Sequence, residues 1–450
     1  MADNPSPAQA GGLIVAGAAS NTGKTTITLA ALRAMVRRGL RVSSGKVGPD
    51  YIDPTYHRAA SGAHCMNLDS FAMSEDTLGR IAGKLASGFD FTLIEGVMGL
   101  FDGSAAGTGS TADIAGRLGL PVLLVLDVSG QSASAGAIAH GFRTFDEKVR
   151  IVGTVLNRVA SPRHGELCRA AVEDAGCPVV SILPEESSIV RERRHLGLRL
   201  AGEDPELKRF MESAADWFEG GTDWPAFTGL FEAPGVSNNH STRGWGLIPP
   251  GGHIAVASDL AFSFVYPHLL AAWKDSGARV SFFSPLAGED PTPSADAIYL
   301  PGGYPELHAE ALSRRSDFFG GLHRAAESGI PVYGECGGYM TLGRTLTDAS
   351  GRTHQMAGLL PVDFTIDRPR RHLGYRRAVL QGPALGESTS ALFYAHEFHY
   401  ASAAHAEPYS ETLKPLFEIE DATGEKLGPA GHLKSSVAGS FVHIIDRAAD

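Results

Sequence analysis

Cys336 lies in the stretch GECGG (334–338), between the short apolar run PVY and the helical pattern YMTLGRTL. Glycines on both sides permit a sharp turn from a strand into a helix, because glycine adopts backbone conformations that strain other residues. Such a turn presents a nucleophile at the end of a strand, and the N-terminus of the following helix lowers the pKa of a thiol. The sequence therefore predicts a cysteine nucleophile. The alternative is a small buried hydrophobe, the commoner role of a lone cysteine.

A second glycine-rich turn offers backbone N–H groups for an oxyanion hole. Gly302 and Gly303 belong to PGGYPE (301–306), which directly follows the apolar run AIYL. Backbone donors beside a nucleophile stabilise the negative charge that develops on the carbonyl oxygen under attack. We therefore predict an oxyanion hole built from Gly302, Gly303 and Gly337.

A thiolate nucleophile also needs a base, which is usually a histidine. Two late motifs carry the candidates: His396 and His399 in YAHEFHY (394–400), and His443 in AGSFVHII (438–445). The residue types alone leave the choice among the three histidines open.

Another chemical signature lies near the N-terminus in GAASNTGKTT (17–26), which follows the apolar run GLIVAGA and opens a helical pattern. Glycines there let successive backbone N–H groups turn toward phosphate oxygens, and the helix N-terminus favours negative charge. Lys24 is expected to contact the β- and γ-phosphates, and the Thr25 hydroxyl to bind Mg²⁺. The residues predicted to line the nucleotide are Gly17, Asn21, Thr22, Gly23, Lys24, Thr25 and Thr26.

The spacing of this phosphate loop departs from the usual one, because five residues instead of four separate Gly17 from Gly23. In this respect it resembles dethiobiotin synthetase and its relatives, a P-loop branch that phosphorylates carboxylates. The resemblance implies ATP as a co-substrate. It also implies that Asn157, in VLNRV at a predicted strand end, contacts the adenine.

Carboxylates at other predicted strand ends fit the same branch. KVGPDYIDPTYH (46–57) carries Asp50, and IEGVMGLFDG (94–103) carries Glu95. We expect both near the phosphate loop, because the carboxyl ends of parallel strands meet at one crevice. A Mg²⁺ site built from Thr25, Asp50 and Glu95 would bridge the β- and γ-phosphates. The predicted substrate contacts in the same region are Lys46, Tyr51 and Asp53.

The motifs around Cys336 resemble those of class I, triad-type glutamine amidotransferases. They are PGGYPE, GECGGYM, HEFHY and GSFVH. The resemblance implies that L-glutamine is the ammonia donor and His443 the base, with structural roles for His396 and His399. Classical members carry a glutamate two positions after the base, where this chain has Ile445. The cobyrinate- and cobyrate-synthase branch also lacks that glutamate, so the residue that orients His443 stays open.

Two series of elements must position these residues. Apolar runs that predict buried strands alternate with helical patterns in the first half, which indicates an α/β fold with a doubly wound parallel sheet. The predicted strands are 12–18, 91–96, 121–128, 151–159 and 178–184, with a helix over 25–39. A second α/β series has predicted strands at 253–259, 278–285, 297–303 and 331–336.

The boundary between the two series is predicted from composition. A helical pattern over 203–219 is followed by a segment rich in Gly, Pro, Ser and Asn. Such segments commonly join domains. We therefore predict a P-loop amidoligase domain over 1–219, a linker over 220–252, and a second doubly wound domain, the class I glutamine amidotransferase domain, over 253–450.

Composition excludes several classes of function. The net charge of −11 argues against nucleic-acid binding, which needs a basic face. No apolar run approaches the roughly 20 residues of a membrane helix, and the opening residues do not resemble a signal peptide. The cysteines have neither paired nor metal-binding spacing. We therefore expect a reduced, cytoplasmic protein, for which a homodimer is a weak expectation.

Across nearly the whole chain the motifs resemble the cobyrinic acid a,c-diamide synthase family of the cobalamin pathway. The most specific are ASNTGKTT, GPDYIDP, NLDSFAM, EGVMGLFDG, PGGYPELHAE, GECGGYM and EFHY. The resemblance implies glutamine- and ATP-Mg²⁺-dependent amidation of the a and c side chains of cobyrinic or hydrogenobyrinic acid. Such a polycarboxylate needs local cations, and the expected contacts are Arg194, Arg370 and Arg371. The alternative for these arginines is a solvated run of charge.

Other functions remain open on sequence alone. Two belong to the same superfamily: cobyric acid synthase and nickel-sirohydrochlorin a,c-diamide synthase. A nucleotide-gated P-loop regulatory protein with an inactive cysteine domain is a rival from a different class. A cysteine hydrolase without ATP coupling is the third alternative.

Overall fold

The computed structural model describes residues 10–105, 107–189, 200–234, 245–366 and 371–448 of the chain. It divides into two compact units, Met1–Phe71 with Leu78–Ser241 and Ala72–Thr77 with Thr242–Asp450. Within the described ranges, all four cysteines are free and buried. None of the helices found there is long and apolar enough to cross a membrane.

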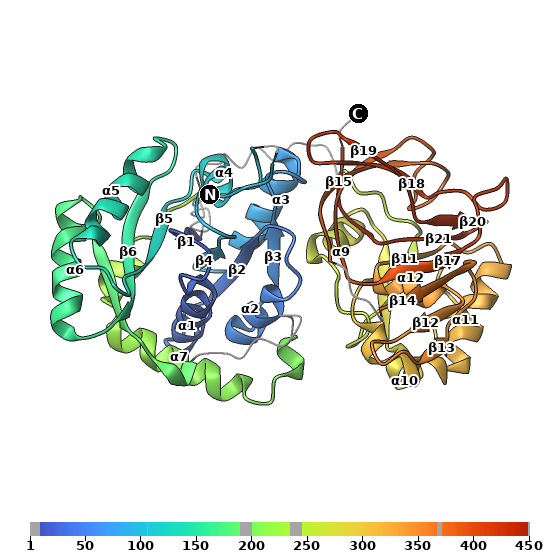
Figure 1. Cartoon of the computed structure of the whole chain (residues 1–450), viewed down its shortest axis with the longest axis horizontal. Coiled ribbons are helices and arrows are strands. Elements are labelled where there is room, and N and C mark those ends of the chain that lie inside the picture. Colours follow the sequence, from blue (N-terminus) through green and yellow to red (C-terminus); the bar gives the residue numbers. More distant parts are fainter. Residues whose placement is uncertain (1–9, 106, 190–199, 235–244, 367–370, 449–450) are drawn as a thin grey trace, which may run out of the picture. The chain divides into compact units, whose positions relative to one another are not determined.

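The first unit is built on a seven-stranded sheet in the order β3-β2-β4-β1-β5-β6-β7 (Figure 1). The strands are β1 (Gly11–Gly17), β2 (Val42–Val47), β3 (Cys65–Leu68), β4 (Phe91–Glu95), β5 (Val122–Asp127), β6 (Ile151–Val159) and β7 (Val179–Pro184). Every neighbouring pair is parallel. The prediction of a parallel sheet is therefore confirmed, whereas β3 was not predicted, because CMNL is too short and mixed to resemble a buried strand.

Helices connect these parallel strands, and two more follow the last of them. They are α1 (Lys24–Arg37), α2 (Asp53–Ser61), α3 (Glu75–Ala86), α4 (Thr111–Leu118), α5 (Ser134–Phe145), α6 (Pro162–Asp174), α7 (Leu207–Gly221) and α8 (Trp224–Thr228), with short 3₁₀ turns at Ser187–Ile189 and Ala201–Glu203. One core joins Leu13 and Val15 of β1 to Met35 of α1 and Phe218 of α7. The core thus packs α1, the helix that follows the phosphate loop, against the sheet.

The predicted linker begins too early. Residues 224–228 form α8, and Phe227 is fully buried in the core of the first unit. The Gly12 N–H donates to the Glu232 carbonyl over 2.7 Å, which ties this segment to β1. The linker was predicted to start too early because its composition is dominated by glycine and proline. Composition alone does not show that an apolar residue such as Phe227 is buried in the core.

The second unit contains a six-stranded sheet in the order β20-β21-β11-β10-β8-β9. The strands are β8 (His253–Ala257), β9 (Arg279–Phe283), β10 (Ala297–Leu300), β11 (Val332–Glu335), β20 (His432–Lys434) and β21 (Val437–Ser440). All pairs are parallel except β20 with β21. The helices are α9 (Pro267–Asp275), α10 (Ala309–Ser313), α11 (Ser316–Glu327) and α12 (Gly337–Leu342), with 3₁₀ turns at Pro285–Ala287 and Pro305–Leu307.

Two further sheets in this unit were not predicted (Figure 1). A four-stranded sheet contains β12 (Thr345–Thr347), β13 (Thr353–Gln355), β14 (Val362–Thr365) and β17 (Ser402–Ala406). A five-stranded antiparallel sheet contains β15 (His372–Leu380), β16 (Leu392–His399), β18 (Phe417–Asp421), β19 (Lys426–Ala430) and β22 (Val442–Arg447). Strand β16 pairs with β22 and sets His396 opposite His443. The motifs HEFHY and GSFVH are therefore neighbours in one sheet.

Replacing Phe227 tests whether α8 belongs to the first unit. We expect Phe227→Ala to lower the free energy of unfolding by about 3–5 kcal/mol, because it empties a fully buried aromatic site. Phe145→Ala is the control, since that ring is 74% exposed. Urea denaturation followed by circular dichroism measures both. Equal midpoints for the two variants would mean that residues 220–234 form a linker after all.

Candidate functional site

Cys336 lies on a strained turn between β11 and α12, as predicted. Its φ is 48° and its ψ is −102°, a conformation that costs energy in a non-glycine residue. The Cys336 N–H donates to the Ser440 carbonyl over 2.8 Å, and this bond anchors the turn to β21. A side chain at Gly338 would come within 1.9 Å of the Leu300 carbonyl oxygen. The glycine after the turn is therefore required by packing.

The three predicted oxyanion-hole glycines meet at this cysteine. A Cβ at Gly302 would lie 2.6 Å from His443 Cε1 and 3.4 Å from Cys336 Cβ, so Gly302 borders both residues. A Cβ at Gly337 would lie 3.0 Å from the Gly303 nitrogen. The Gly337 N–H donates toward the Cys336 sulfur. Backbone donors and nucleophile are thus close enough to act on one carbonyl group.

The pKa of the Cys336 thiol moves in the opposite direction to the prediction. Burial, followed by the negative charge of Glu306, raises it well above the usual range, against the lowering effect of the Gly337 N–H. The six-residue α12 is too weak a dipole to overcome a site from which water is excluded. The thiol is therefore protonated in this structure, so the predicted role of Cys336 as a nucleophile calls for a base beside it.

Glu335, which sequence analysis missed, is the carboxylate beside His443. Glu335 Oε2 lies 3.5 Å from His443 Nδ1, and both side chains are 1% exposed. At the position of the classical glutamate, the apolar Ile445 side chain is buried and its carbonyl accepts a 2.7 Å bond from His268. The sequence feature that could have pointed to Glu335 is its position directly before Cys336 in GECGG.

The other two histidines have neighbours that suit structural roles. Burial and the adjacent His443 lower the pKa of His396 to about 3, which keeps the ring neutral. His399 bonds to the Ala401 carbonyl over 2.7 Å and to Glu397 over 2.9 Å, and it stacks on Phe441. Both nitrogens of His399 are therefore occupied.

The phosphate loop closes around its own backbone in the first unit. Lys24 Nζ and Thr22 Oγ1 both donate to the Ala19 carbonyl, over 3.1 and 3.2 Å. Gly23 has φ 97°, and a Cβ there would lie 2.4 Å from Asn157 Nδ2. Burial lowers the pKa of Lys24, although nearby Glu95 opposes this. The loop thus presents a backbone cradle, with a lysine at its end, of the kind that phosphate groups need.

Asn157 supports this loop from β6. Its Nδ2 donates to the Thr22 carbonyl over 2.8 Å, and its Oδ1 accepts from the Arg158 N–H over 2.9 Å. Arg158 in turn contacts Asp127 and donates to the Asn21 carbonyl. Adenine contact by Asn157 remains a prediction, and the contacts of Asn157 in the structure position the loop.

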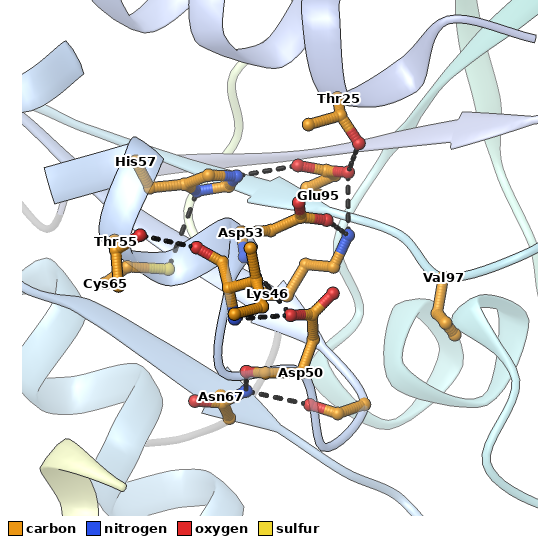
Figure 2. Close-up of polar contacts among 12 residues, drawn as sticks. Thr25, Lys46, Asp50, Asp53, Thr55, His57, Cys65, Asn67, Glu95 and Val97 are labelled. Carbon is orange, nitrogen blue, oxygen red and sulfur yellow. Dashed lines mark hydrogen bonds and ion pairs between the residues drawn. The ribbon is translucent and has the colours of Figure 1, made fainter. Parts of the chain in front are cut away.

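Beside the loop, the fully buried Glu95 joins four elements (Figure 2). Glu95 Oε1 accepts from Thr25 Oγ1 over 2.5 Å and from Lys46 Nζ over 2.7 Å. Glu95 Oε2 lies 2.6 Å from His57 Nε2. Lys46 also donates to Asp53 over 2.6 Å. A charged network therefore connects α1, β2, α2 and β4, and it brings Thr25, Lys46, Asp53 and Glu95 together.

The charges in this network stabilise one another. Although burial favours a neutral carboxyl group, Lys46 and His57 hold the pKa of Glu95 well below its usual range. Burial also favours a neutral imidazole, yet Cys65 and Glu95 raise the pKa of His57 to about 10. Against burial, Asp53 and Glu95 raise the pKa of Lys46 above its usual range. Sequence analysis missed His57, which lies four residues after Asp53 and hence on the same face of α2.

The predicted magnesium ligands are only partly assembled. The Thr25 hydroxyl donates to Glu95 Oε1 over 2.5 Å, so these two predicted ligands are neighbours that are hydrogen-bonded to each other. Asp50 instead caps a turn, since its Oδ1 accepts from the Ile52 and Asp53 N–H groups over 2.7 and 3.1 Å. Burial and then Asp53 raise the pKa of Asp50 to about 7. Across the ranges given above, no group of three or more His, Cys, Asp or Glu side chains has metal-binding geometry.

The predicted substrate contacts differ in what the structure shows of them. Lys46 forms ion pairs with Asp53 and Glu95. Tyr51 lies just before α2. Arg371 is exposed immediately before β15. Arg194 and Arg370 lie outside the described residues. Contact between these side chains and a substrate thus remains a prediction.

Comparison with known proteins accounts for both units. Residues 13–196 match the CobQ/CobB/MinD/ParA nucleotide binding domain, and residues 253–449 match the CobB/CobQ-like glutamine amidotransferase domain. The expected pairing of a nucleotide-binding domain with a glutamine amidotransferase domain is confirmed.

Similar curated proteins share the name hydrogenobyrinate a,c-diamide synthase. The chain is 48% identical over 436 residues to the protein of Brucella abortus, covering 97% of this chain and 98% of the relative. It is 45% identical over 441 residues to the Sinorhizobium sp. protein, covering 97% and 99% of the two chains. It is 46% identical over 438 residues to the Rhodobacter capsulatus protein, covering 96% and 98%. With both halves matched and nearly full coverage, the chain belongs to the hydrogenobyrinate a,c-diamide synthase family.

Proposed function

We propose that this protein is an ATP-dependent amidoligase that converts the a and c side-chain carboxylates of hydrogenobyrinic or cobyrinic acid to amides, using glutamine nitrogen. The observation that carries the proposal is a cysteine–histidine–glutamate cluster and a phosphate loop in one chain, which aligns along 97% of its length with the Brucella abortus relative. Relatives named for hydrogenobyrinate favour the cobalt-free acid over the rival tetrapyrroles. The reaction belongs to cobalamin biosynthesis, and we place it in the cytoplasm.

The glutamine half of the reaction takes place at Cys336. His443 accepts the thiol proton, and the sulfur attacks the side-chain amide carbon of glutamine. The N–H groups of Gly303 and Gly337 bind the oxyanion, and His443 returns the proton to the departing nitrogen. Ammonia leaves, and water hydrolyses the cysteine thioester to glutamate and free thiol.

The ATP half of the reaction takes place at the phosphate loop. A substrate carboxylate oxygen attacks the γ-phosphorus and releases ADP, giving an acyl phosphate. Lys24 neutralises charge on the phosphates, and Thr25 with Glu95 would hold Mg²⁺, with Asp50 as a further candidate. When bound, Mg²⁺ would offset the negative charge of the β- and γ-phosphates. Ammonia then displaces inorganic phosphate from the acyl group, which leaves a primary amide.

Binding of the corrin acid requires positively charged side chains. The acid carries many carboxylates, and the chain has a net charge of −11, so cationic side chains must hold it locally. We propose Arg371 for this role, together with Arg194 and Arg370. Lys46 contributes a buried positive charge 2.7 Å from Glu95. Homodimer formation is a further, separate prediction.

Replacing the nucleophile separates the two half-reactions. We expect Cys336→Ser to reduce glutamine-driven amidation below about 0.1% of wild type, because the hydroxyl is a far poorer nucleophile at this site. Amidation driven by ammonium chloride should persist, since the ATP half does not use Cys336. Cys168→Ser, which changes another buried cysteine, is the control. Loss of the ammonia-driven reaction in Cys336→Ser alone would contradict the separation.

Replacing the phosphate-loop lysine should abolish both reactions. We expect Lys24→Ala to reduce amidation with either nitrogen donor at least about 100-fold, because charge on the γ-phosphate is no longer neutralised. Lys208→Ala, which removes an exposed lysine from α7, should leave the rate unchanged. Steady-state ADP release measures both variants. Full activity of Lys24→Ala with ammonia would refute an ATP-dependent step at this loop.

Counting amides in the product identifies the acceptor. Incubation with hydrogenobyrinic acid, ATP and glutamine should add two amide groups, which mass spectrometry detects as two replacements of OH by NH₂. Parallel reactions with cobyrinic acid, its a,c-diamide and nickel-sirohydrochlorin test the related acceptors. Turnover of the a,c-diamide or of nickel-sirohydrochlorin, without turnover of hydrogenobyrinic or cobyrinic acid, would overturn the proposed substrate class.

A further inference from the structure

We propose that Glu335, the residue before the nucleophile, is the positioning residue that orients His443 and stabilises its protonated form. This inference concerns the glutaminase step and rests on the proposed function only through that step. It supplies the third member of a triad in a chain whose position 445 is isoleucine. The carboxylate comes from the strand of the nucleophile instead of the strand of the histidine.

Glu335 is held rigidly at the end of β11. Its Oε2 accepts from the Tyr299 hydroxyl over 2.8 Å and lies 3.5 Å from His443 Nδ1. Its Oε1 accepts from the Tyr333 hydroxyl and from the Ile444 N–H, each over 3.2 Å. The Ile444 bond joins the carboxylate directly to the backbone beside His443. Carboxylate and imidazole are thus fixed relative to each other by neighbouring covalent and hydrogen bonds.

Three hydrogen-bond donors surround the Glu335 carboxylate. The Tyr299 hydroxyl, the Tyr333 hydroxyl and the Ile444 N–H all point at its two oxygens. Burial, and then the charge of Glu335, raise the pKa of both Tyr299 and Tyr333, so the phenols remain donors. Within the described part of the chain, His443 is the one basic side chain within ion-pair distance of this carboxylate. The His443 imidazole is therefore the group that faces this buried carboxylate.

This arrangement meets the needs of proton transfer from Cys336. His443 Nδ1 is the ring nitrogen that approaches Glu335 Oε2, at 3.5 Å. A proton carried on Nδ1 would lie beside the carboxylate and would leave Nε2 to accept the thiol proton. The Cys336 thiol stays protonated at rest, because burial and Glu306 raise its pKa. Moving its proton to His443 creates a cation in a buried site, and the Glu335 carboxylate offsets that charge. Without it, the ion pair of thiolate and imidazolium forms much less readily.

The geometry also explains how consecutive residues serve one histidine. Neighbouring side chains in a regular strand point to opposite faces of the sheet. The strand ends at Glu335, and the left-handed turn at Cys336, with φ 48°, redirects the chain. As a result the Glu335 carboxylate and the Cys336 Cβ both lie close to the His443 ring, the latter across Gly302.

The test compares Glu335→Gln with Glu387→Gln, which breaks an ion pair with Arg447 elsewhere in the same unit. We expect Glu335→Gln to reduce kcat for glutamate release about 100-fold, with KM for glutamine changed less than about threefold. The rate of Cys336 alkylation by iodoacetamide, assayed at about pH 7.5, should fall together with kcat and gives an independent readout. Glu387→Gln should leave all three quantities unchanged.

Two further measurements keep the result interpretable. Ammonia-driven amidation by Glu335→Gln should stay within about twofold of wild type, which shows that the fold and the ATP half are intact. If Glu335→Gln does not fold, Glu335→Asp replaces it in the test. This variant keeps the carboxylate but moves it back by one methylene, so we expect a lower kcat for glutamate release with KM unchanged. A kcat within threefold of wild type in a folded variant would overturn the role of Glu335. Glutamate release reports this result whether or not hydrogenobyrinic acid proves to be the acceptor.

Discussion

The hydrogen bond between the Cys336 N–H and the Ser440 carbonyl, 2.8 Å long, is the interaction on which the glutamine site depends. It continues the parallel pairing of β11 with β21, in which Glu335 faces Ser440. Three residues after Ser440 comes His443, in the next strand β22, so the pairing of β11 with β21 brings the chain back to Cys336 just before the predicted base. The same principle operates in the first unit, where the pairing of β2 with β4 sets Lys46 directly opposite Glu95. In both units, strand register brings polar side chains together at the carboxyl ends of parallel strands.

A fully buried carboxylate lies at each of these ends, and each has a different task. Glu95 is surrounded by Lys46, His57 and the Thr25 hydroxyl, a set that holds the loops next to the phosphate cradle. Glu335 has two phenols, one backbone N–H and a single imidazole. In the first arrangement, the positive charges of Lys46 and His57 surround the negative charge of Glu95 near the predicted nucleotide. The second places the carboxylate beside the imidazole that we propose accepts the thiol proton.

Sequence alone was sufficient where chemistry and local conformation coincide. Cys336 between glycines, and Lys24 after a glycine turn, each require a particular backbone shape, so the elements around them were predicted within a few residues. Glu335 and His57 were missed because their contacts are with residues far away in the sequence. Glu335 lies beside His443, and His57 lies beside Glu95. The pKa of Cys336 was predicted in the wrong direction, since burial and Glu306 act through space. The two further sheets after residue 344, one mixed and one antiparallel, were missed because their strands mix polar and apolar residues.

The central claim is that ATP activates a corrin carboxylate, which ammonia from Cys336 then converts to an amide. Oxygen-18 in the carboxylates of hydrogenobyrinic acid tests it most directly, because the attacking oxygen must leave with phosphate. With glutamine and ATP, each amide formed should release one inorganic phosphate carrying one oxygen-18 atom. Amide formation accompanied by unlabelled phosphate would show that no acyl phosphate forms, and would contradict the account.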